Sequence, residues 1–117
     1  MNLFSKIKAS LRLRQAILLA DKAHRKSGFR YFVIPVHGSH GKKLMVLDRF
    51  NFRRLKMKHY IHRLASMSDL QKECFYYTGH ANGRNTISPQ QRQMKIAQYF
   101  AWVEADRKAT KQHRKNG

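Results

Sequence analysis

The chain has 117 residues, a mass of 13.9 kDa and 42% hydrophobic residues, which predicts one folded domain and excludes a wholly disordered basic tail. Its 25 Lys and Arg oppose six Asp and Glu, so the formal net charge is +19 and the isoelectric point is about 10.9. Such a chain repels itself, and this charge favours a polyanion such as RNA or DNA as its partner. The single cysteine excludes an intrachain disulfide.

Apolar residues recur at spacings of three and four near the N-terminus, which predicts a first helix over about residues 3–26. The members of this pattern are Phe4, Ile7, Leu11, Ala16, Ile17, Leu18 and Ala20. Gly28 follows where a left-handed residue would end the helix, and the late Arg25 and Lys26 suit the negative end of the helix dipole. A transit peptide could have a similar composition, but the pattern continues past Asp21 without a cleavage site, which favours an ordinary basic helix.

Two short apolar segments predict β-strands. Residues 30–36 are aromatic and β-branched, and residues 43–47 form a second run. The glycine-containing segment 37–42 between them has the length of a hairpin connection, so an antiparallel hairpin is expected. Pro35 lacks a backbone N–H and should lie at an edge or near a strand end.

Two helices are expected directly after the hairpin. Asp48 has the position of an N-cap for a helix from Arg49 to about Ile61. A capping-box spacing that begins at Ser68 predicts a short helix that continues through Tyr77. The polar, turn-rich segment 78–86 is then expected to be a loop.

The strongest local signal belongs to the last helix. Ser88 has the position of an N-cap, Pro89 the first helical position and Gln91 the third, which predicts a helix to about Arg107. Residues 108–117 contain no large apolar side chain and are expected to form a basic arm that is flexible when free.

The predicted elements follow the order α-β-β-α-α-α. The expected fold class is α+β: a predominantly helical single domain over residues 1–107, with a two-stranded antiparallel hairpin and the basic C-terminal arm over residues 108–117. Helices must cover the hairpin, because an isolated hairpin is marginally stable in water. The order differs from that of a double-stranded-RNA-binding domain, and the signatures of RNA-recognition motifs and KH domains do not occur.

Basic residues are concentrated on the predicted strand, turn and helix over residues 42–61, and no acid occurs between Asp48 and Asp69. A merely solvated charged face usually has acids spaced four residues from the bases. Arg can donate two parallel N–H groups to a phosphate, and Lys supplies a point charge. Together with the first helix and the C-terminal arm, the expected nucleic-acid-binding residues are Arg12, Arg14, Arg25, Lys42, Lys43, Arg49, Arg53, Arg54, Lys56, Lys58, His59, His62, Arg63, Lys111, Arg114 and Lys115.

Aromatic residues lie among the basic ones and could stack on unpaired bases. The candidates are Tyr31, Phe50, Phe52, Tyr60, Tyr76 and Tyr77. In a small domain most aromatic rings belong to the core, so we expect one or two of these rings to be exposed.

Histidines allow a metal hypothesis. The candidate ligands are His37, His40, His59, His62, His80 and Cys74. Structural zinc sites usually use paired cysteines, however, and this chain has one. The hairpin and helix histidines, with Asn51, also resemble the ββα-metal nuclease family, but Asn51 follows the second strand and carboxylate ligands are scarce. Since no catalytic motif occurs, we expect a nonenzymatic protein without a metal or cofactor.

The segments GKKLMVLDRFNFRRLKMKHYI and ECFYYT resemble segments of small basic proteins of phages and mobile elements. The resemblance implies no catalytic residue and favours a phage-related nucleic-acid or virion role. We therefore expect binding to the phosphate backbone of RNA or DNA, with other proteins of a nucleoprotein assembly as further candidate partners. The alternatives are a virion or assembly adaptor that docks an acidic protein surface, and a small metal-dependent nuclease. The expected location is cytoplasmic or virion-associated, without a membrane partner or a small-molecule substrate.

Overall fold

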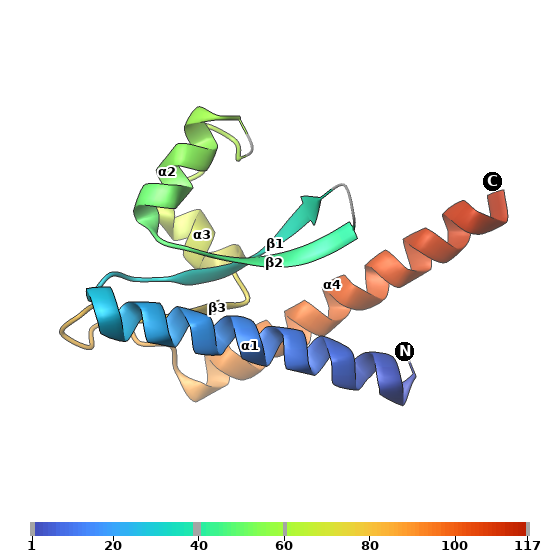
Figure 1. The fold of residues 1–117 in the computed structure, drawn as a ribbon, viewed down its shortest axis with the longest axis horizontal. Helices are drawn as coiled ribbons and strands as arrows, with labels where there is room; N and C mark the ends of the chain where they lie inside the picture. Colours follow the sequence, from blue (N-terminus) through green and yellow to red (C-terminus); the bar gives the residue numbers. More distant parts are fainter. Residues whose placement is uncertain (1, 39–40, 60, 117) are drawn as a thin grey trace.

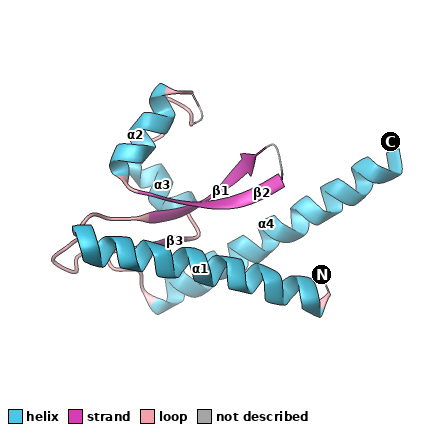
Figure 2. Ribbon diagram, in the orientation of Figure 1, coloured by secondary structure: helices cyan, strands magenta, loops and turns pink. Residues whose placement is uncertain are grey.

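A computed structural model describes residues 2–38, 41–59 and 61–116. Its elements are α1 (Leu3–Ser27), β1 (Phe32–Gly38), β2 (Gly41–Leu47), α2 (Arg49–Met57), α3 (Met67–Glu73), β3 (Tyr76–Tyr77) and α4 (Pro89–Asn116). The sheet lies between two helical layers, with α1 and the first half of α4 on one side and α2 and α3 on the other (Figures 1 and 2). The predicted α+β class is confirmed, whereas the third strand was not predicted.

The sheet is antiparallel, with the strand order β2-β1-β3. The predicted hairpin is confirmed, and its register places Phe32 opposite Leu47. β3 pairs with Phe32 and Val33 of β1, so the helix expected to continue through Tyr77 was predicted wrongly. Burial explains the difference, because Tyr76 and Tyr77 are both buried and belong to the cores on opposite sides of the sheet. A strand directs successive side chains to opposite faces in this way, and a helix does not.

Pro35 lies in the part of β1 that extends beyond β3, as its missing N–H requires. The carbonyl groups of Tyr31 and Val33 accept hydrogen bonds from the N–H groups of Thr78 and Phe75, at 2.9 and 2.8 Å. Alternate residues of a strand direct their backbone groups to the same side. The nitrogen of Pro35 therefore faces the open edge past β3, which confirms the prediction.

The strands contribute to two separate cores. Val33 faces α1 and α4, whereas its neighbour Phe32 faces α2 and α3, and both are fully buried. The buried members of the first core are Ala9, Leu13, Ala16, Ile17, Ala20, Val33, Phe75, Tyr76 and Tyr99. Those of the second core are Phe32, Leu47, Phe52, Leu70, Cys74 and Tyr77. Burial on both faces explains why the sequence of β1 is almost continuously apolar.

α1 ends as predicted, because Gly28 has a left-handed φ of 77° and its N–H donates to the carbonyl of His24 at 2.7 Å. Its apolar residues, however, fall on two faces. The buried face consists of Ala9, Leu13, Ala16, Ile17 and Ala20. The exposed apolar residues are Leu3, Phe4, Ile7, Leu11, Leu18 and Leu19. Small side chains on the buried face let the helix approach the sheet closely, so the larger ones are not needed there.

α2 begins at its predicted N-cap and ends earlier than expected. The carboxylate of Asp48 accepts a hydrogen bond from the N–H of Asn51 at 2.9 Å. The helix ends at Met57 rather than near Ile61, and His59 has a left-handed φ of 63°. This turn starts the loop that leads from α2 to α3.

The N-cap of α3 is Ser66 rather than the predicted Ser68. The N–H of Asp69 donates to the hydroxyl of Ser66 at 3.2 Å, and the N–H of Ser66 donates to the carboxylate of Asp69 at 2.9 Å. Both serines have a polar residue three positions later, but a carboxylate accepts these hydrogen bonds more strongly than an amide does. The capping box therefore forms two residues earlier than predicted.

α4 begins as predicted, with Pro89 at its first position and the N–H of Gln91 donating to the hydroxyl of Ser88 at 3.1 Å. Its helical backbone continues to Asn116, past the predicted end near Arg107 and through most of the expected arm. That the arm is flexible when free stays a prediction. Over the described part of the chain, no helix combines the length and the apolar character needed to cross a membrane.

Candidate nucleic-acid interface

The predicted basic residues that are close in sequence also lie together, on α2 and the loop after it. Phe52 is buried in the second core, whereas the arginines of the short helix are exposed to solvent. We call the exposed basic residues of α2 and of the loop after it the α2 patch. Its basic members, all exposed, are Arg49, Arg53, Arg54, Lys58, His59, His62 and Arg63.

Two exposed aromatic rings adjoin the α2 patch. Phe50 of α2 and Phe29 of the loop after α1 are 48% and 49% exposed, and their ring centroids are 5.4 Å apart at an interplanar angle of 72°. The guanidinium of Arg49 lies 5.2 Å from the centroid of Phe50. An exposed ring beside a guanidinium group offers the surface on which a nucleic-acid base stacks. Phe29 was missed because a lone aromatic residue in a loop belongs to no periodic pattern.

The other aromatic candidates have different positions. Phe52, Tyr76 and Tyr77 are buried in the cores, and Tyr31 is half-buried. Tyr60 lies outside the described residues. Phe50 is therefore the exposed member of the predicted set among the residues that the structure describes, which agrees with the expectation that most of these rings pack inside.

The ammonium group of Lys56 is held by contacts within the fold. Its Nζ donates to the carbonyl of Ala65 at 2.7 Å and lies 5.3 Å from the ring centroid of Phe52. The side chain is half-buried, because it follows Phe52 by one helical turn on the inner side of α2. The hydrogen bond of Lys56 holds the loop after α2, with its basic residues, against the helix.

The histidines and the cysteine of the metal hypothesis do not come together in the described part of the chain. No group of three or more His, Cys, Asp or Glu there could hold a metal ion. Nδ1 of His62 accepts a hydrogen bond from the N–H of Leu64 at 3.1 Å. Burial raises the pKa of Cys74, which keeps this thiol protonated inside the second core. The side chains of His37 and His40 lie outside the description.

A groove of about 830 Å³ between α1, β2 and α4 brings together two predicted residues from distant parts of the chain. Arg12 of α1 and Lys43 of β2 line it with Lys8, and all three are exposed. Trp102 of α4, which is half-buried, contributes aromatic surface to its wall. This second basic surface lies on the side of the sheet opposite the α2 patch, as the layers in Figure 1 show.

The remaining predicted residues lie apart from these two surfaces or outside the description. Arg14 and Arg25 are exposed on α1. Lys42 belongs to β2, but its side chain is not described. The same holds for three residues of α4, namely Lys111, Arg114 and Lys115. The structure thus divides the predicted contact set between two faces of the sheet.

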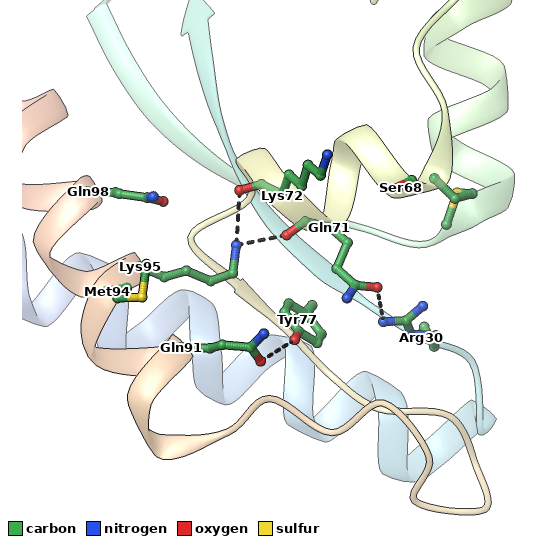
Figure 3. Close-up of a pocket in the computed structure, with 10 residues that line it drawn as sticks. Arg30, Ser68, Gln71, Lys72, Tyr77, Gln91, Met94, Lys95 and Gln98 are labelled. Carbon is green, nitrogen blue, oxygen red and sulfur yellow. Dashed lines mark hydrogen bonds between the residues drawn. The ribbon is translucent and has the colours of Figure 1, made fainter.

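A pocket of about 500 Å³ between α3 and α4 contains cations that sequence reasoning did not single out (Figure 3). Lys95 is buried, and its Nζ donates to the carbonyls of Gln71 and Cys74 at 2.8 and 2.7 Å. Arg30 donates to the side chain of Gln71 at 3.0 Å, and burial lowers its pKa. These groups hold α3 against α4 and β1 and are already hydrogen-bonded, so they contribute to stability rather than to a phosphate site.

Three of the six acids accept hydrogen bonds from other residues of the fold. Asp48 caps α2, Asp69 belongs to the capping box of α3, and Asp21 accepts a hydrogen bond from the hydroxyl of Tyr76 at 2.6 Å. Hydrogen bonds from Ser66 lower the pKa of Asp69, which keeps this carboxyl ionised. Asp48 and Asp69 thus stabilise the starts of α2 and α3, and Asp21 connects α1 to β3.

Comparisons with models of protein families, with curated proteins and with solved structures find no match to this chain.

Proposed function

We propose that the protein is a nonenzymatic nucleic-acid-binding protein that contacts the phosphate backbone mainly through the α2 patch. The observation that supports this most directly is the set of exposed arginines on α2 beside two exposed aromatic rings. No acid occurs in the sequence from Arg49 to Ser68. Because no acid lies among these basic residues, the surface is positively charged and attracts phosphate.

The aromatic pair favours an unpaired strand over a uniform duplex. Phe29 and Phe50 are half exposed and lie at the edge of the basic surface. Every base has a flat face that can stack on such a ring, so stacking adds affinity without base specificity. The groove that contains Arg12 and Lys43 is a second place where phosphates could be neutralised, on the other face of the sheet.

The salt dependence of binding tests this proposal. Affinity for a labelled single-stranded oligonucleotide is measured by fluorescence anisotropy over a range of NaCl concentrations. Each phosphate contact on a single strand contributes about −0.7 to the slope of log K against log salt. Arg53→Ala/Arg54→Ala should therefore make the slope shallower by about 1.4.

The matched control removes the same charge from exposed positions outside the α2 patch, as Lys72→Ala/Arg84→Ala. This variant should keep the slope of the wild type, because it loses no phosphate contact. A wild-type slope near zero would refute nucleic-acid binding. Equal changes in both variants would show that net charge, and not the α2 patch, determines the affinity.

A further inference from the structure

The outer face of α1 carries large apolar side chains that are exposed to solvent. Phe4 is 78% exposed and Leu3 is 73% exposed, while Ile7, Leu11 and Leu18 are each at least half exposed. We call these five residues the α1 strip. Isolated apolar residues are common on protein surfaces, but five large ones along one face of a helix mark a surface that binds something.

The α1 strip is not an unfinished part of the core. At 3.6 residues per turn, Phe4, Leu11 and Leu18 lie one above the other, on the side of the helix away from Leu13 and Ala20, which are buried. The buried face of α1 is already filled against the sheet and α4. The α1 strip therefore faces away from the domain.

The charges around the α1 strip indicate the sign of its partner. Lys8 and Arg12 are exposed along one side of it, and Arg14 interrupts it between Leu11 and Leu18. No acid precedes Asp21 in the chain, and the carboxylate of Asp21 is engaged by Tyr76. A second copy of the same helix would place these cations against one another, so the partner must be negatively charged.

The order of residues along the α1 strip also favours a lipid surface over a partner helix. Paired helices need apolar residues at both repeating positions of a heptad, so that each side chain enters a hole in the partner. Here Phe4, Ile7 and Leu11 follow that spacing, but Arg14 occupies the next position. A helix with Phe and Leu on one face and Lys and Arg beside them is typical of helices that lie in the interface of an anionic bilayer.

We propose that α1 binds the surface of an anionic phospholipid bilayer, with the α1 strip entering the boundary between headgroups and acyl chains. Lys8, Arg12 and Arg14 then contact the lipid phosphates, because long basic side chains extend from the apolar region to the headgroups. α1 and α2 lie on opposite sides of the sheet (Figure 1). The α2 patch therefore stays accessible when α1 is on the bilayer, and the two surfaces can be tested separately.

The experiment uses cosedimentation with vesicles of equal parts phosphatidylglycerol and phosphatidylcholine, and with vesicles of phosphatidylcholine alone. Any strongly basic protein binds anionic vesicles at low salt, so binding is also measured in about 1 M NaCl, where the screening length is about 3 Å. The variant Phe4→Ser/Leu11→Ser removes two members of the α1 strip. The control Met57→Ser/Leu64→Ser removes two exposed apolar side chains on and just after α2, which are 74% and 76% exposed where Phe4 and Leu11 are 78% and 50% exposed.

The wild type and the control should remain bound to the anionic vesicles in high salt, and the α1 variant should bind at least about 10-fold more weakly. Circular dichroism and thermal unfolding should be alike in all three proteins, because the changed side chains are exposed.

Complete release of the wild type in high salt, or equal binding by the two variants, would show that charge alone is responsible and would overturn the proposal. A dimer in sedimentation velocity that the α1 variant dissociates would also overturn it, by making the α1 strip a contact between copies. Arg53→Ala/Arg54→Ala should keep its retention on vesicles in high salt, which separates this proposal from nucleic-acid binding.

Discussion

Helices α1 and α2 are both basic and both rich in apolar residues, yet they differ in the size of the residues that they bury. α2 buries its central ring, Phe52, and exposes its arginines. α1 buries mainly small residues such as Ala16 and Ala20 and exposes its larger ones, including Phe4. The contrast shows that the size of an apolar residue does not decide whether it is buried. The space between helix and sheet decides it, and that space differs between the two layers.

The largest effect expected from this contrast is on stability. Phe52→Ala should lower the free energy of unfolding by about 3–5 kcal/mol, because it leaves a cavity in the second core. Phe4→Ala removes a phenylalanine side chain from α1 and should change the free energy of unfolding by less than about 0.5 kcal/mol. Urea unfolding followed by circular dichroism measures both. A comparable loss in the two variants would mean that the α1 strip is buried in solution.

The next effect concerns the cations of α2, which are not equivalent. Lys56→Ala should cost about 1.5–3 kcal/mol, because it removes the charged donor to the carbonyl of Ala65. Arg53→Ala, on the exposed side of the same helix, should be nearly neutral for stability. The measurement is again urea unfolding. If Arg53→Ala is the more destabilising of the two, the division into structural and solvent-facing cations is incorrect.

Alkaline pH should weaken the packing of α1 rather than that of α2, because hydrogen bonds from tyrosine hydroxyls hold α1 in place. Tyr76 donates to Asp21 of α1 and Tyr99 donates to the carbonyl of Ala9, at 2.6 and 2.7 Å. Burial raises the pKa of both tyrosines, and for Tyr76 the bond to Asp21 adds to the increase.

The sign of the pH effect follows from these raised pKa values. The folded state keeps both protons after the unfolded chain begins to ionise near pH 10, so their contribution is complete below pH 10 and is lost as the pH rises above it. Each tyrosine can remove up to about 1.4 kcal/mol per pH unit in that range. Thermal unfolding between pH 9 and pH 11 (about one unit either side of the unfolded pKa) should show this fall. Tyr76→Phe/Tyr99→Phe should have a flatter profile, and a profile as steep as that of the wild type would contradict the assignment.

The smallest effect concerns the helix N-caps. Asp48→Ala should cost about 1 kcal/mol, because the carboxylate satisfies the N–H of Asn51 at the start of a helix of nine residues. Asn2→Ala removes the corresponding cap of α1, which has 25 residues. Its cost should be smaller, because the long helix can fray by a turn without exposing its buried face. Equal costs in chemical unfolding would show that the ends of the two helices are held alike.

Local signals predicted the helix starts at Asp48 and Ser88, the end of α1 at Gly28 and the β1–β2 hairpin. Each of these depends on hydrogen bonds or backbone angles within a few residues, which the sequence specifies directly. The third strand escaped prediction because two residues are too short for a detectable alternation, and their burial depends on both helical layers. Arg30 and Lys95 escaped it because their hydrogen-bond partners are distant in sequence.

The candidate site shows the same division. That the basic residues of 49–63 lie close together follows from their closeness in sequence, and their exposure follows from Phe52 being the buried ring of α2. That Arg12 and Lys43 line one groove, and that Phe29 packs against Phe50, depends on how the hairpin joins α1 to α2, which no local pattern encodes.

By itself, the sequence determined the charge of this protein, its α+β class, the starts of α1, α2 and α4 and the end of α1, because these depend on composition and on neighbours within about one turn. The tertiary structure alone decided which apolar residues of α1 are buried and which basic residues share a surface. The reason is geometric: helical periodicity shows that α1 has apolar residues in two directions, but only packing against the sheet and α4 determines which direction faces inward.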